Sequence, residues 1–292
     1  MSYHLLGVSL ALLSALLFGS GDFSGGFATR RGFATGRGTA TGRPRPFQVL
    51  AWSALSGALA LGLLAGWTRE PLPGRASLLW AAGAGLSGAL GLVALYRALA
   101  QGNAAVVSPI AGVVGAALPV VVGVFTQGLP GAARLLGFAS AMIGIGLVTR
   151  SPSHSAGASR EQIVLALLSG VAFGAFYLCA AQIEPGAVLA PLAVAKVTGG
   201  CVAWGAAFLG GRRLPAVQGS GIAWLSGALD AGANALYLLA QQYTRLDVAV
   251  VLSSLYPAVT VLLAYLLLKE RISRVQWVGV ALSTTAISLI AV

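Results

Sequence analysis

The sequence predicts an all-α integral membrane protein in which ten transmembrane helices form two inverted five-helix repeats. The composition, the long apolar segments and an internal repeat lead to this prediction. Hydrophobic residues make up 57% of the 292 residues and charged residues only 9%, against about 25% charged in an ordinary soluble domain. A surface this poor in charge suits lipid rather than water. The 40 glycines fit the same environment, because small residues let helices approach closely inside a bilayer.

Ten apolar segments are long enough to cross about 30 Å of hydrocarbon, and polar, proline or arginine residues separate them. They lie at 5–28, 48–67, 77–96, 104–127, 131–149, 162–182, 188–209, 219–241, 247–268 and 275–292. Pro109 and Pro119 interrupt the fourth segment. The first segment follows no basic region and precedes no small-residue cleavage site, so we expect a retained span rather than a removed signal peptide.

Each segment ends at a recognisable break. In the first half the breaks are the arginine-rich stretch 30–46, REPLPGR (69–75), RALAQGN (97–103), QGLPG (127–131) and RSPSHSAGASR (150–160). In the second half they are IEPGA (183–187), GRRLP (211–215), QQYTR (241–245) and KERISR (269–274). The breaks are short, as expected for helices that cross a membrane repeatedly.

The net charge of +11 is distributed unevenly among these breaks. Thirteen basic residues follow odd-numbered segments and four follow even-numbered ones. The positive-inside rule therefore places the odd breaks in the cytoplasm and both termini outside it, in a multi-pass inner-membrane protein. In this setting the arginine-rich stretch is interpreted as a solvated loop at the lipid headgroups, and no nucleic-acid partner is expected.

The sequence repeats itself. ALLSALLFG (11–19) returns as ALLSGVAFG (166–174), 155 positions later, and Gly137 has a counterpart 142 positions later in Gly279. These offsets predict two five-helix units, 1–150 and 160–292, with a longer loop in the first. Five crossings are an odd number, so the second unit enters the membrane from the opposite side. Inverted repeats of this kind are typical of secondary transporters.

Residues 253–292, with Pro257, the pair Lys269 and Glu270, and Gly279, are similar to the C-terminal signature of the drug/metabolite transporter superfamily, EamA branch. LFGSGDF (17–23) resembles the first helix of that family. The resemblance implies a secondary transporter, commonly an exporter of amino acids. The family also includes carriers of sugar-type and lipid-linked substrates. This chain departs from the pattern because the first half lacks the glutamate that Glu270 supplies in the second.

Ionisable groups inside spans cost about 2.5 to 3.5 kcal/mol each on insertion and tend to face a cavity or a partner. Asp22, Lys196 and Asp230 stand out in this respect. Asp230 begins a polar stripe that continues through Asn234, Tyr237 and Gln241 at helical spacing. Two interpretations remain open: the stripe lines a substrate pathway, or Asp230 forms a structural ion pair with Lys196.

The repeat offset relates Asp22 to Tyr177 and Phe18 to Phe173. These residues are expected to line a central crevice, or else to be a helix-end acid and packed aromatic residues. Pro257 frees a helix carbonyl near Ser253, Ser254 and Tyr256. The candidate substrate-binding residues are Phe18, Asp22, Phe173, Tyr177, Lys196, Asp230, Asn234, Tyr237, Ser254 and Tyr256.

Histidines occur only at His4 and His154, both outside the predicted spans, and no GxxxxGK[ST] stretch is present. No metal, cofactor or enzyme activity is therefore expected. The sequence predicts a secondary transporter that exports small metabolites, above all amino acids, by alternating access at a cavity between the two repeats. The alternatives are a carrier of lipid-linked or sugar-type substrates, or a non-transporting membrane enzyme or assembly subunit. Monomer and homodimer both remain open.

Overall fold

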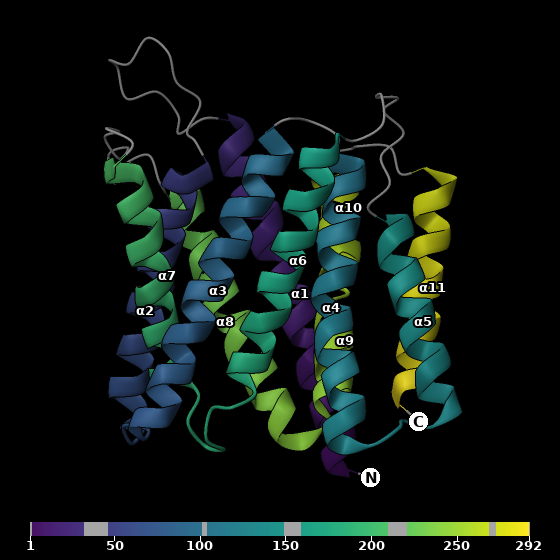
Figure 1. The fold of residues 1–292 in the computed structure, drawn as a ribbon, viewed down its shortest axis with the longest axis horizontal. Helices are drawn as coiled ribbons and strands as arrows, with labels where there is room; N and C mark the ends of the chain where they lie inside the picture. Colours follow the sequence, from purple (N-terminus) through teal and green to yellow (C-terminus); the bar gives the residue numbers. More distant parts are fainter. Residues whose placement is uncertain are drawn as a thin grey trace.

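The computed structural model describes residues 2–31, 46–100, 104–148, 159–209, 221–268 and 273–291. Within these ranges the chain forms helices standing side by side, with no strand, and the ends of α1 and α11 that carry the termini lie at the same end of the bundle (Figure 1). The helices are α1 (Ser2–Arg31), α2 (Pro46–Thr68), α3 (Arg75–Ala100), α4 (Ala104–Gln127), α5 (Ala132–Val148), α6 (Arg160–Ala180), α7 (Leu189–Leu209), α8 (Gly221–Tyr243), α9 (Leu246–Ser253), α10 (Tyr256–Leu268) and α11 (Arg274–Ala291). Most of the predicted arginine-rich loop, at 32–45, and the Lys269–Glu270 pair lie outside the described residues.

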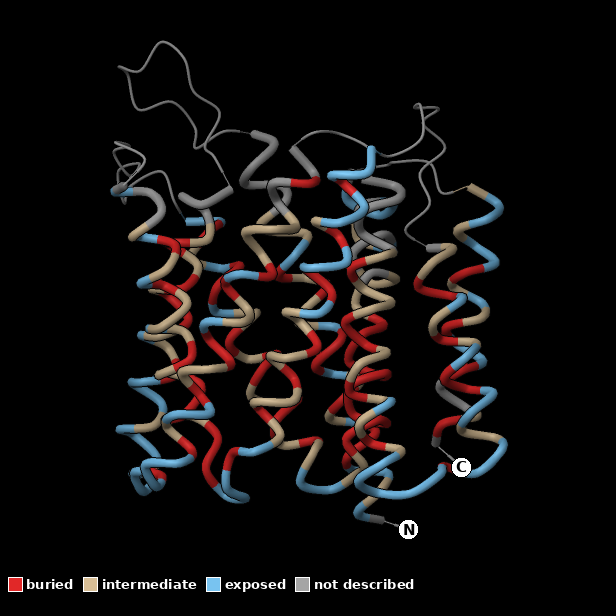
Figure 2. The backbone as a smooth tube through the Cα atoms, viewed as in Figure 1, coloured by how far each residue is buried: buried red, intermediate tan, exposed pale blue. Residues whose placement is uncertain are grey.

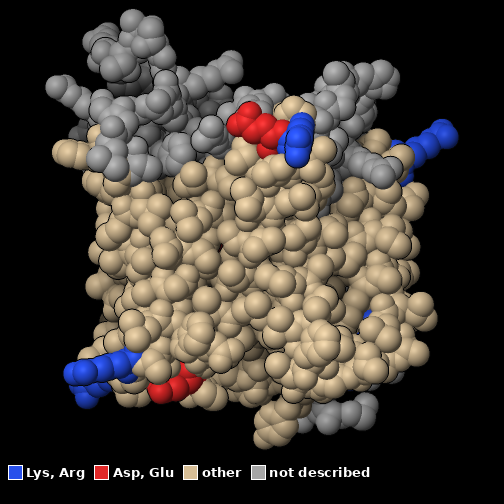
Figure 3. Space-filling view, viewed as in Figure 1, with Lys and Arg blue, Asp and Glu red and all other residues tan. Residues whose placement is uncertain are grey.

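Among the described residues, six helices are long and apolar enough to cross a membrane. These spans are Tyr3–Gly25, Leu50–Thr68, Arg75–Leu95, Ile110–Gln127, Arg160–Ala180 and Gly221–Tyr243, and Ala132–Leu147 and Leu189–Gly205 form shorter apolar helices. Figure 3 shows the described charged side chains gathered almost entirely at the two ends of the face in view, with a broad uncharged belt between them. The chain is therefore a multi-pass membrane protein.

Two helices, α6 and α11, begin with the same N-terminal capping motif. The stretch SREQ precedes and opens α6, and Ser159 and Gln162 form a capping box in which each side chain bonds the other residue's backbone N–H. The stretch SRVQ opens α11 in the same way, with Ser273 bonded to Gln276. A capping box satisfies N–H groups that no helical carbonyl reaches, so the sequence itself sets where these two helices start.

Helix pairs that are far apart in sequence pack through hydroxyl groups. On α1, the Ser14 hydroxyl donates to the carbonyl of Ala233 on α8 at 2.8 Å. On α6, the Ser169 hydroxyl donates to the carbonyl of Gly91 on α3 at 2.9 Å. The two donors are 155 positions apart and the two acceptors 142 apart, which are the offsets of the internal repeat. The same interhelical bond therefore occurs twice.

Glycines give a second pair of related contacts. Gly85 on α3 lies against the carbonyl of Ala195 on α7, and Gly227 on α8 lies against the carbonyl of Ser53 on α2. Neither position has room for a Cβ atom. Both the glycines and the residues that they meet are 142 positions apart. Close approach through glycine thus joins α3 to α7 and α2 to α8, and α5 packs on α11 in the same manner through Gly144.

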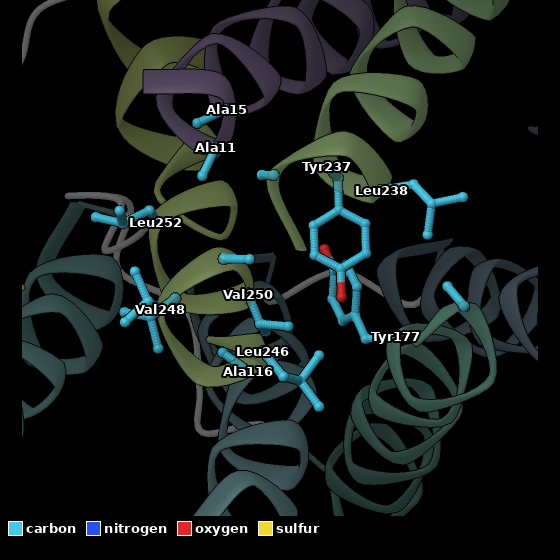
Figure 4. Close-up of a cluster of buried hydrophobic side chains, with 14 of the residues drawn as sticks. Ala11, Ala15, Ala116, Tyr177, Tyr237, Leu238, Leu246, Val248, Val250 and Leu252 are labelled. Atoms are coloured by element: carbon cyan, nitrogen blue, oxygen red, sulfur yellow. The ribbon is translucent and has the colours of Figure 1, made fainter. Parts of the chain in front are cut away.

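The ninth predicted span is not one helix. It divides into α9 and α10, with a turn at Ser254 and Leu255 directly before Pro257. All of α9 is buried, and its Val248 packs in a core cluster with Ala11 of α1 and Ala116 of α4 (Figures 2 and 4). The expected interruption of the paired span is absent, because α4 runs without a break through Pro109 and Pro119.

We predict that Gly227→Ala lowers the melting temperature of the detergent-solubilised protein, because the new methyl group displaces α2 from α8. An overpacked contact of this kind costs about 1 to 3 kcal/mol. Gly62→Ala is the matched control, since a Cβ there meets nothing within 4 Å. Equal melting temperatures for the two variants contradict the prediction.

Candidate functional site

Lys196 of α7 and Asp230 of α8 form an ion pair between their ammonium and carboxylate groups. The ion pair expected from the sequence is thereby confirmed. Two glycines lie beside it, since a Cβ at Gly57 of α2 would lie 3.4 Å from Lys196 Cδ and one at Gly21 of α1 would lie 3.4 Å from the Asp230 backbone nitrogen. The Lys196 and Asp230 side chains keep 19% and 35% of their surface accessible. The two charged groups are thus paired with each other but still partly accessible.

Asn234 lies one turn beyond Asp230 on α8. Its Nδ2 donates to the Asp230 carbonyl oxygen at 2.7 Å and to the carboxylate Oδ1 at 3.2 Å. These two bonds orient the Asp230 carboxylate, whose other oxygen faces Lys196. Asn234 is only 3% exposed, so the amide is a rigid part of the site. The start of the polar stripe predicted on this helix therefore forms one connected group.

Asp22 of α1 is exposed and lies within electrostatic range of Asp230. It makes no hydrogen bond or ion pair with the described residues. Tyr177 of α6 interacts electrostatically with both acids. Asp22 and its repeat-related residue Tyr177 are thus within electrostatic range of each other, and their shared role at a central crevice stays a prediction.

Two tyrosines stand between this charged group and α9. The rings of Tyr177 and Tyr237 meet edge to face, with centroids 4.9 Å apart (Figure 4). Both tyrosines lie in the same buried hydrophobic cluster as Leu252 and Leu255, at the break between α9 and α10. Tyr237 is 1% exposed. These contacts link the broken helix to the helix that carries Asp230.

The phenylalanines behave differently. Phe18, one turn before Asp22, packs against Tyr256 with ring centroids 6.1 Å apart. Phe173 instead packs on α3 and α4, where it meets Gly91 and Gly115. The structure therefore joins Phe18 and Tyr256 to the break at the start of α10 and places Phe173 in a helix interface, the packing alternative expected for it.

The end of the bundle that carries the termini is closed by charged groups. Arg245 donates to both carboxylate oxygens of Asp247, which is fully buried, and to the carbonyls of Gln127 and Gly128 at the end of α4. Gly128 has a φ of 80°, a conformation that suits glycine at a helix C-terminus. Hydrogen bonding to Asp247 raises the pKa of Arg245, so the contact stays ionised. It ties the start of α9 to α4.

Sequence reasoning missed three acids at this end. Asp247 stands at the edge of an apolar segment, which made it indistinguishable from a loop residue. Glu70 accepts backbone N–H groups of Val188, Leu189 and Ala190 at the start of α7, where a negative charge complements the helix dipole. Glu184 accepts the N–H of Gly74 just before α3. Both glutamates bind backbone N–H groups of residues that are far away in the sequence, so no local sequence pattern predicts their roles.

Comparisons with known proteins give a family and a fold. Residues 161–292 match the model of the EamA-like transporter family. Among 23 similar chains of solved structures, one crystal structure of a protein superposes with a TM-score of 0.75 at 18% identity, covering 97% of this chain and 95% of its own. At that identity the likeness shows the fold alone. No curated protein matches the sequence.

The family match confirms the assignment made from residues 253–292 and indicates the drug/metabolite transporter superfamily. The matched residues, 161–292, are thus similar to a family of transporters.

We predict that Arg245→Gln lowers the free energy of unfolding by about 3 kcal/mol, because it leaves the buried Asp247 carboxylate without its counter-ion. Chemical or thermal denaturation in detergent measures the change. Arg75→Gln removes an exposed arginine at the same end and is expected to have no measurable effect. A stability loss that is the same in both variants would sink the prediction.

A double-mutant cycle tests the ion pair. Lys196→Met and Asp230→Asn each leave one charge unpaired, so each is expected to lower the melting temperature. The double variant should lose less than the sum of the two, with a coupling of about 1 kcal/mol. Additive losses would mean that the two groups do not stabilise each other in the folded protein.

Proposed function

Since residues 161–292 match the model of the EamA-like transporter family, we propose that this chain is a secondary transporter that exports small metabolites, above all amino acids. It works by alternating access at a central site between two inverted repeats. The charged group formed by Asp22, Lys196 and Asp230 carries this proposal. Charges are placed inside a membrane-spanning bundle only at a cost, and a zwitterion supplies the complementary ammonium and carboxylate.

The repeats are proposed to be residues 1–150 and 160–292, with α9 and α10 together forming one of ten spans. The paired hydroxyl bonds of Ser14 and Ser169 and the paired glycine contacts of Gly85 and Gly227 support this arrangement. They indicate a pseudo-two-fold relation in which α1 corresponds to α6 and α3 to α8. A match over 97% of the chain to one solved fold is consistent with both halves being built on one plan.

Alternating access is supported by the difference between the two ends. The buried α9 and the contacts of Arg245 with Asp247 and α4 close the end that carries the termini. Asp22 and Asp230, by contrast, keep accessible surface. The basic residues of the loops favour an orientation in which this end faces away from the cytoplasm. In that orientation the conformation corresponds to one that receives substrate from the cytoplasm.

A second candidate is a carrier of lipid-linked or sugar-type substrates. The partly accessible Asp230 and the exposed apolar surface of the helices suit a site that a lipid chain enters sideways. Such a substrate needs no carboxylate partner, so this candidate tolerates Asp230→Asn. The amino-acid proposal does not, because the substrate ammonium would lose its counter-ion and Lys196 would be left unpaired.

The test is the flux of radiolabelled amino acids in proteoliposomes, with and without an imposed pH gradient. We expect Asp230→Asn to lower flux by about tenfold or more, equivalent to about 1.4 kcal/mol of lost binding. If flux through the Asp22→Asn variant no longer depends on the pH gradient, Asp22 is identified as the proton carrier. Thr284→Ala is the control, because Thr284 is exposed on α11 and bonds only within its own helix.

Absence of flux for every amino acid, in protein that melts cooperatively, rejects amino acids as the cargo. Full activity of Asp230→Asn toward a sugar or lipid panel then selects the second candidate.

A further inference from the structure

The charged group carries one more acid than base. Lys196 is neutralised by Asp230, which leaves Asp22 as an additional carboxylate within electrostatic range of the pair. Asp22 makes no hydrogen bond or ion pair with the described residues, and its side chain is exposed. A cationic group beside Asp22 favours the ionised form of that carboxyl, and with both acids ionised the three groups sum to a formal charge of −1. A ligand that balances this charge carries a net positive charge.

A buried acceptor points the same way. The Asn234 Oδ1 atom is buried and has no hydrogen-bond partner among the described residues, although Asn234 is only 3% exposed. The orientation of the amide is determined by the two bonds from Nδ2 to Asp230, since the flipped amide would place oxygen against oxygen. A buried acceptor atom without a hydrogen bond is costly. We therefore expect this oxygen to accept a hydrogen bond from an N–H group of the ligand.

Aromatic rings complete the surroundings. Phe18 lies one helical turn from Asp22 on the same face of α1, and its ring packs against that of Tyr256. Tyr177, which interacts electrostatically with Asp22, stacks edge to face on Tyr237. Aromatic faces attract organic cations. Carboxylate, amide oxygen and aromatic rings are all groups that favour an ammonium or guanidinium.

We propose that the molecule transported through this site is a basic amino acid, with one more cationic group than carboxylates. This inference rests on the proposed function and narrows it. The substrate carboxylate forms an ion pair with Lys196. Asp230 then no longer pairs with Lys196 and binds the α-ammonium of the substrate instead. Asp22 and the Asn234 oxygen then hold the second cationic group. A neutral amino acid binds Lys196 through its carboxylate and Asp230 through its ammonium. It has no second cationic group to bind Asp22 and the Asn234 oxygen.

The first measurement is ligand binding, which does not require transport. Melting temperatures of the purified protein are compared in saturating lysine, leucine, glutamate and the diamine cadaverine. We expect lysine to raise the melting temperature by about 3 °C or more and leucine and glutamate to leave it unchanged. Asp22→Asn is expected to abolish the lysine effect. Ser20→Ala, which removes a hydroxyl bonded only within α1, is expected to retain it.

Stabilisation by leucine equal to that by lysine overturns the inference, as does a lysine effect that survives in Asp22→Asn. Stabilisation by cadaverine without lysine overturns the role given to the substrate carboxylate and points to a diamine.

The second measurement is flux in proteoliposomes. We expect lysine flux to exceed leucine flux by about tenfold, and Asp22→Asn to reverse that preference by lowering lysine flux while leucine still passes. Leucine flux that equals lysine flux and falls equally in Asp22→Asn rejects the basic substrate but keeps the transporter. Lysine-specific stabilisation without flux of any amino acid keeps the binding site and rejects the proposed function.

Discussion

Lipid offers no hydrogen bond and no counter-ion, so a charge or a spare carbonyl in the membrane belt must find a partner within the bundle or face a water-filled cavity. Lys196 and Asp230 meet this requirement only because α7 and α8 are held close to each other and to α1 and α2. Glycines create that closeness, at Gly21 and Gly57 beside the pair and at Gly227 where α8 meets α2. The high glycine content is therefore a condition for placing charge inside the protein.

The two halves share packing but not chemistry. Equivalent serines bind equivalent helices, and equivalent glycines meet equivalent carbonyls. Yet the second half supplies Lys196, Asp230 and Asn234, whereas the first supplies one acid, Asp22, and the aromatic ring of Phe18. The break before Tyr256 also occurs in the second half alone, since α4 is continuous. Contacts that recur at the offsets of the sequence repeat thus surround a charged group that does not recur.

Much of the architecture could be read from local patterns. Apolar segments bounded by proline, glycine and arginine predicted the positions of α2, α6 and α8 closely, because insertion into lipid depends on the hydropathy of one segment at a time. Spacing along a helix likewise predicted that Asp230 and Asn234 share a face. The pair between Lys196 and Asp230 was predicted as one of two alternatives, because only these residues had opposite charge within neighbouring spans.

The sequence by itself determined the membrane class, the repeat, the family of the second half and the ionisable residues of the candidate site. Only the tertiary structure decided that Phe173 packs between α3 and α4, that Asp247 is buried, and that Glu70 caps a helix more than a hundred residues away. The physical reason is the distance along the sequence over which each interaction acts. Hydropathy and capping act within one helix, whereas the partner of a buried charge is chosen by which helices meet, and that depends on the whole bundle.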